Sequence, residues 1–207
     1  WLKGSSGRPP PPRKQGPASP ATPHETTAAR ATALPHQAPP AMDLVSSMGL
    51  TLEDKSGRAV PASRLAGKAV ALYFSAHWCP PCRKFTPMLK AFYEDAVKGG
   101  AAVEIIFVSG DKSEAEGKAY FQEHHGNWLM LKSQQADALS QKYAVKGIPA
   151  LVVIDPKGKA VVPNAREDVQ SAPADAAAVV ARWRGLGAGP DWRESAGATL
   201  GGGQPSA

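Results

Sequence analysis

Cysteine is scarce in this sequence, and its scarcity narrows the class of protein. The 207 residues include two cysteines, Cys79 and Cys82, which belong to one short motif. So few cysteines exclude a fold built on several disulfides, as in small secreted proteins, and favour a reducing compartment. A structural zinc site is disfavoured because it needs four ligands, and the adjacent His124 and His125 would point in different directions on a helix. A structural disulfide is disfavoured because its loop would be very short.

Long apolar runs are absent as well. No uninterrupted apolar stretch reaches about 18 residues, so we expect no membrane span. Hydrophobic residues still make up 43% of the chain, enough for one domain with a core. The formal net charge is +6, and residues 1–41 carry five basic side chains against one acidic, which leaves +2 for the remainder. A solvated basic tail is therefore favoured over a nucleic-acid-binding patch.

The composition changes sharply along the chain. The first 41 residues hold ten of the 20 prolines, with Ala, Ser and Thr and no hydrophobic periodicity. We predict residues 1–42 to be a disordered Pro/Ala-rich basic tail, residues 43–184 a folded domain, and residues 185–207 a flexible Gly-rich tail. Since the chain begins at Trp1, we expect Met42 to be the start of translation. An organellar transit peptide is the alternative for this segment.

The two cysteines lie where a strand pattern gives way to a helix pattern. The apolar run 70–74 is typical of a buried strand, and the following segment has helical spacing of apolar residues, namely Phe85, Met88, Leu89, Phe92 and Ala96. Cys79 would then stand at a helix N-terminus, where free N–H groups and the helix dipole favour a thiolate. A thiolate attacks disulfides, and Cys82, one turn further, can close a small disulfide ring. The pattern predicts a redox-active dithiol.

Three further residues fit this prediction. Pro80 and Pro81 fall at the start of the helix, where proline costs little, and they stiffen the ring. Trp78 is a large apolar side chain beside the attacking sulfur.

The rest of the domain alternates strand and helix signals. Ser113 and Glu116 have the spacing of a capping box. The expected elements are a hairpin over 50–60, a strand over 69–75, a helix ending near 98, a strand over 103–108, helices over 113–124 and 135–143, an antiparallel hairpin over 150–162, and a helix over 174–183.

Several strings in this chain resemble the nucleoredoxin and tryparedoxin branch of the thioredoxin superfamily. They are YFSAHWCPPCRKFTPML, VEIIFVSGD, YAVKGIPALVVIDPKGK and NAREDVQ, and the resemblance covers about residues 48–184. It implies an α/β thioredoxin fold, with a central mixed β-sheet flanked by helices and an N-terminal β-hairpin extension. It also implies that Cys79 attacks and Cys82 resolves. Pro149 would be a cis-proline facing the sulfurs, and the Ile148 backbone would pair with an extended substrate segment.

The resemblance extends to other substrate-binding positions. It implies that Asp111 and Arg166 help to bind substrate, together with Trp78, Pro80 and Pro81. Solvated loop charges are the alternative for Asp111 and Arg166.

Two positions depart from the pattern. Gly110 stands where tryparedoxins usually carry a tryptophan, so one flat wall of the groove is missing. Tyr73 stands where thioredoxin keeps a buried aspartate, which leaves the proton acceptor for Cys82 open. Glu104 on the next strand is a candidate for that role. His77 is expected to have no catalytic role.

These observations predict a dithiol–disulfide oxidoreductase that reduces protein disulfides without a cofactor or metal. The alternatives are a redox-gated protein-binding module of nucleoredoxin type and a thiol oxidase or isomerase. The expected partners are disulfide-containing proteins and an upstream thiol or flavin reductase, with no nucleic acid and no membrane. We expect a monomer in the cytoplasm or nucleus, with organellar transit as the alternative.

Overall fold

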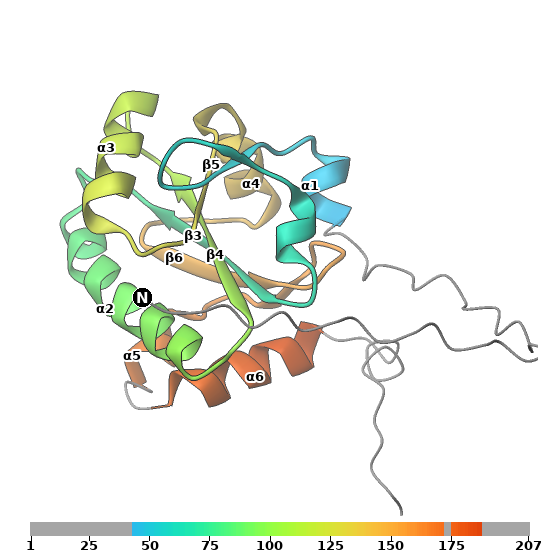
Figure 1. Ribbon diagram of the computed structural model, residues 1–207. Helices are drawn as coiled ribbons and strands as arrows, with labels where there is room; N and C mark the ends of the chain where they lie inside the picture. Colours follow the sequence, from blue (N-terminus) through green and yellow to red (C-terminus); the bar gives the residue numbers. More distant parts are fainter. Residues whose placement is uncertain (1–42, 172–174, 188–207) are drawn as a thin grey trace, which may run out of the picture. The chain divides into compact units, whose positions relative to one another are not determined.

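The computed structural model describes residues 43–171 and 175–187 (Figure 1). The predictions for residues 1–42, including the start at Met42, and for residues 188–207 lie outside this part. Residues 185–187, which the sequence assigned to the C-terminal tail, belong to the last helix.

A seven-stranded mixed sheet forms the centre of the domain, in the order β2-β1-β5-β4-β3-β6-β7. β3 is parallel to β4 and β4 to β5, whereas the other neighbours are antiparallel. The strands are β1 Leu52–Glu53, β2 Ala59–Val60, β3 Ala69–Ser75, β4 Val103–Ser109, β5 Leu129–Leu131, β6 Ala150–Ile154 and β7 Ala160–Val162. The predicted thioredoxin fold and its N-terminal hairpin are thus confirmed.

Helices cover both faces of this sheet (Figure 1). They are α1 Asp43–Ser47, α2 Pro80–Lys98, α3 Glu114–His124, α4 Ala136–Lys142, α5 Arg166–Ser171 and α6 Ala176–Gly187, with 3-10 turns at Ala62–Leu65 and Ser133–Gln135. One apolar cluster joins β3 and β4 to α2, α3, α5 and α6, and a second joins the other face to α1 and α4. No helix in the described part is long and apolar enough to cross a bilayer.

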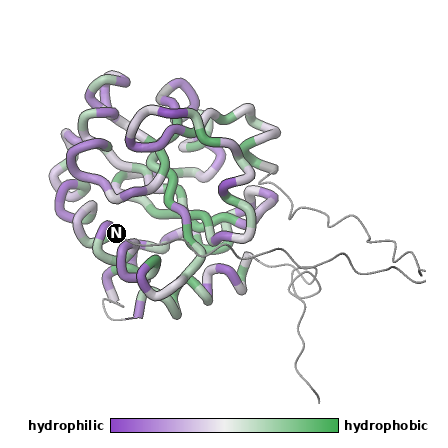
Figure 2. Tube along the Cα trace, viewed as in Figure 1, coloured by the Kyte–Doolittle hydropathy of each residue, from purple (hydrophilic) through white to green (hydrophobic). Residues whose placement is uncertain are grey.

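The strand alternation explains the two clusters. Tyr73 and Phe107 point into the cluster under α2, whereas Phe74 and Val108 point into the other. Every residue of β3 and β4 is buried, as expected for parallel strands covered on both faces. Figure 2 shows the apolar residues concentrated along these central strands.

The sequence did not predict three short elements, α1, β5 and α5. It also placed one exposed side chain, that of Met88, on the buried face of α2. α1, β5 and α5 have five, three and six residues, too few for periodicity to reveal. Met88, predicted on the buried face of α2, is 44% exposed. The neighbouring Thr86 is buried instead.

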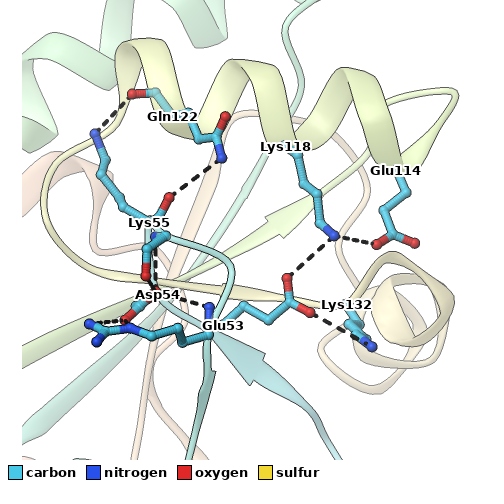
Figure 3. A network of polar contacts seen from close by, with 9 residues as sticks. Glu53, Asp54, Lys55, Glu114, Lys118, Gln122 and Lys132 are labelled. Carbon is cyan, nitrogen blue, oxygen red and sulfur yellow. Dashed lines mark hydrogen bonds and ion pairs between the residues drawn. The ribbon is translucent and has the colours of Figure 1, made fainter.

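The β1–β2 hairpin is fastened to α3 by polar contacts (Figure 3). Lys55 Nζ donates to the Gln122 and His125 carbonyls, at 3.2 and 2.6 Å, and so satisfies acceptors at the C-terminal end of α3. Glu53 pairs with Lys118 of the same helix at 3.5 Å. The hairpin extension is therefore packed onto the domain.

Candidate redox site

Cys79 and Cys82 meet at the N-terminus of α2. Their sulfurs lie within disulfide-bonding distance, and their Cα atoms are 5.2 Å apart. Cys79 is the N-cap of the helix, and its sulfur accepts a hydrogen bond from the Cys82 backbone N–H at 3.3 Å. Pro80, at the first helical position, has no N–H to leave unpaired. The sequence therefore forms this junction locally, as predicted.

The loop before β6 closes the site from the opposite side. The Ile148–Pro149 peptide is cis, as the resemblance implied, and Pro149 is buried. The Ile148 carbonyl oxygen lies 3.7 Å from Cys79 Sγ. Ile148 also packs against the small apolar cluster formed by Ala76, Cys79 and Cys82. The backbone predicted to pair with a substrate segment thus lies beside Cys79 Sγ.

Trp78 extends the exposed surface of the site. Its side chain is 55% exposed, yet its indole N–H donates to the Gly110 carbonyl at 3.0 Å. Pro80 and Pro81 are exposed beside it. A Cβ at Gly110 would meet nothing closer than 3.7 Å, so a methyl group would fit at this position.

Asp111 bonds within the protein. Its Oδ1 accepts from the His77 N–H and its Oδ2 from the Ser109 hydroxyl, each at 2.8 Å. Asp111 therefore ties the loop before Cys79 to the end of β4, a role that the sequence did not suggest. Its contact with substrate stays a prediction.

The His77 side chain makes ring contacts near the site that the sequence did not predict. Its ring packs against the Tyr120 ring, with centroids 5.3 Å apart, and against the His124 ring at 5.9 Å. These contacts place α3 against the loop that carries Trp78 and Cys79.

Arg166 lies at the start of α5, beneath α2. Its guanidinium stands over the Phe85 ring at 5.5 Å. Its Nε is buried and has no hydrogen-bond partner in the described part of the chain. Arg166 therefore contacts α2, the helix that carries Cys82. The role of Arg166 in substrate binding stays a prediction.

Glu104 is not the proton acceptor for Cys82, so that sequence prediction is wrong. Glu104 pairs with Val70 in the β3–β4 ladder, five residues before the Ser75–Ser109 pair that leads into the site. Five residues of strand span about 16 Å. The buried carboxylate instead accepts from Lys68 Nζ at 2.7 Å and Arg64 Nε at 3.4 Å. It forms a structural ion pair at the far end of the sheet.

A cluster of three hydroxyl groups lies under α2, and we call Tyr73, Thr86 and Tyr120 the hydroxyl cluster. Thr86 Oγ1 lies 2.8 Å from Tyr73 Oη and 2.6 Å from Tyr120 Oη, and it donates to the Cys82 carbonyl at 3.0 Å. All three side chains are at most 2% exposed. Burial raises the pKa of Tyr73 to about 12. The one available sequence signal was the spacing of four between Cys82 and Thr86, which places a hydroxyl below the cysteine carbonyl.

Comparison with known proteins agrees with this geometry. A family model described as thioredoxin-like matches residues 67–160. The chain is 40% identical to mouse nucleoredoxin over 117 residues, which are 55% of this chain and 26% of that protein. It is 38% identical to probable nucleoredoxin 1 of Arabidopsis thaliana over 122 residues, 59% and 21% of the two chains.

Solved structures give the same result. Thioredoxin from Wuchereria bancrofti has 44% identity and a TM-score of 0.55, covering 59% of this chain and 86% of that one. Tryparedoxin I from Leishmania major has 34% identity and a TM-score of 0.57, covering 64% and 94%. The fold and these relatives place the chain in the thioredoxin-like oxidoreductase family. The chain belongs to the nucleoredoxin- and tryparedoxin-like branch of that family. It spans about a quarter of the length of the curated nucleoredoxins that it matches.

Proposed function

We propose that this protein reduces disulfides of other proteins through Cys79 and Cys82. The observation that carries the proposal is the asymmetry of the pair. Both cysteines are buried, but only Cys79 is the N-cap of α2, and its Sγ accepts a hydrogen bond from the Cys82 backbone N–H. A helix N-terminus stabilises a thiolate, so Cys79 is the group suited to attack.

The reaction follows from this order. The Cys79 thiolate attacks one sulfur of the substrate disulfide, forms a mixed disulfide and expels the other substrate sulfur as a thiolate. The Cys82 thiolate then attacks Cys79 Sγ, which releases the second substrate thiol and leaves the Cys79–Cys82 disulfide. Two electrons pass to the substrate. An upstream thiol or flavin reductase would restore the dithiol in the cytoplasm or nucleus.

The surroundings of Cys79 support an extended protein segment as the substrate. Trp78 offers an exposed apolar face, and the Ile148 carbonyl lies beside the sulfur. Backbone pairing with such an edge gives affinity with little sequence selection. Pro149, Asp111 and Arg166 would complete the binding surface.

Reduction of insulin disulfides, followed with several candidate electron donors, tests the proposal. Wild-type protein should turn over, Cys79→Ser should be inactive, and Cys82→Ser should accumulate a mixed disulfide with the substrate. Turnover by Cys79→Ser would refute the assignment. A reduction potential of roughly −270 to −200 mV fits a reductase, whereas a value near −120 mV would indicate an oxidase. No turnover, together with partner binding that changes with the redox state, would favour a redox-gated binding module.

A further inference from the structure

The hydroxyl cluster contacts the backbone of Cys82 directly. We propose that this cluster holds the Cys82 turn and thereby shifts the equilibrium of the Cys79–Cys82 pair toward the disulfide, with Thr86 as the positioning residue. The inference deepens the proposed function and rests on it for the reversible redox chemistry of the pair.

Counting protons fixes the direction of each hydrogen bond in the cluster. Thr86 has one hydroxyl proton and three partners. The Cys82 carbonyl can only accept, so Thr86 donates to it and accepts from both Tyr73 and Tyr120. One donor and two acceptors are the full capacity of a hydroxyl, so Thr86 is saturated. It links β3, α2 and α3 at a point one helical turn from Cys82.

The backbone hydrogen bonds near the start of α2 are interrupted, so an additional anchor matters there. Pro87 lies inside the helix and has no N–H. Pro87 cannot donate to the carbonyl of Arg83, the residue after Cys82. The Thr86 hydroxyl adds a donor to the Cys82 carbonyl where the helix ladder is weakened.

The hydroxyl cluster carries no charge and is shielded from solvent. Its three side chains are at most 2% exposed, so water does not compete for these hydrogen bonds. The raised pKa of Tyr73 keeps its phenol protonated across the pH range in which thiols titrate. The cluster therefore acts through geometry, with no change of charge.

The direction of the effect follows from conformational entropy. In the disulfide form the Cys79–Cys82 ring restrains the turn even without Thr86. In the dithiol form that ring is open, so loss of the anchor gives the turn more freedom there than in the disulfide. Removing the Thr86 hydroxyl should therefore favour the dithiol.

The test is the equilibrium constant of the protein disulfide in reduced and oxidised glutathione. Two glutathione molecules reduce the Cys79–Cys82 disulfide and become one glutathione disulfide, so atoms and electrons balance. Thr86→Val should lower the constant for disulfide formation roughly threefold to tenfold, the range of one hydrogen bond. A tenfold change corresponds to about 30 mV. Thr86→Ser keeps the hydroxyl and should stay within twofold of wild type.

A triple variant separates the effect of Thr86 on the redox equilibrium from its effect on the stability of the fold. In Thr86→Val the two phenols lose their acceptor, which lowers the melting temperature. The triple variant Thr86→Val, Tyr73→Phe, Tyr120→Phe removes these stranded donors and should recover much of that loss. Its redox equilibrium should remain shifted because the Cys82 carbonyl still lacks the additional hydrogen bond from the Thr86 hydroxyl. A purely structural role would instead weaken both redox forms equally and leave the equilibrium unchanged.

Tyr93→Phe is the matched control. Tyr93 is also on α2 and donates to the Asn127 carbonyl at 3.1 Å, so the variant loses a phenol hydrogen bond without touching the cluster. It should leave the equilibrium unchanged. The inference is overturned if the equilibrium constant of Thr86→Val or of the triple variant stays within twofold of wild type. It is also overturned if Thr86→Ser changes this constant as much as Thr86→Val does. Failure of the wild-type pair to form a disulfide in any glutathione buffer would instead overturn the proposed function.

Discussion

Replacement of His125 by leucine should stabilise the protein and remove part of its sensitivity to acid. His125 is fully buried among aromatic rings, the nearest being Phe107 at 4.2 Å and Tyr120 at 4.6 Å between centroids. Neither ring nitrogen has a hydrogen-bond partner in the described part of the chain. A buried polar group without partners costs about 1–3 kcal/mol, so an apolar side chain of similar size should recover part of that free energy.

The acid sensitivity follows from the pKa of His125. Burial lowers this pKa well below its usual range, and the charges of Lys55 and His124 lower it further. The native protein therefore keeps His125 neutral, whereas the unfolded chain binds a proton below about pH 6.5. The unfolded state then holds more protons, so the free energy of unfolding falls as the pH falls, by up to about 1.4 kcal/mol per pH unit. Between pH 7 and pH 5 this amounts to about 2 kcal/mol.

Urea denaturation at pH 7, 6 and 5 provides the assay. His125→Leu should retain about 2 kcal/mol more of its pH 7 stability at pH 5 than wild type does. His124→Leu is the matched control because that neighbouring ring is half exposed, and it should follow wild type. If wild type and His125→Leu lose stability in parallel, His125 is not held neutral by burial and the reasoning fails.

Three other predictions concern the site and its support. Cys79 should alkylate faster than Cys82 in the reduced protein at neutral pH, as peptide mapping would measure; preferential labelling of Cys82 would reverse their assigned roles. Asp111→Ala should speed hydrogen exchange of the His77 amide and slow turnover, because the loop before the site loses its tie to β4; unchanged exchange would contradict this. Glu104→Gln should lower the free energy of unfolding by about 1–3 kcal/mol in urea titrations yet leave turnover unchanged. A large loss of turnover would return Glu104 to the mechanism.

The sequence alone determined the features that depend on neighbouring residues. A buried strand followed by Cys79, two prolines and an apolar helix face forms the N-cap of α2 without help from distant parts of the chain. The apolar run of β4, interrupted by Glu104, likewise predicted a strand over 103–108. The family resemblance added the cis-proline at Pro149, which periodicity cannot reveal.

Tertiary structure decided the features that depend on strand register and helix packing. Glu104 and Ser109 share one strand, but only the pairing of β3 with β4 shows which end faces the sulfurs. Asp111 could have been a solvated charge until packing placed it against the His77 amide. Thr86, Tyr73 and Tyr120 meet because α2 and α3 pack on the same face of β3. Contacts between residues distant in sequence leave no local pattern, so this chemistry could be read only from the fold.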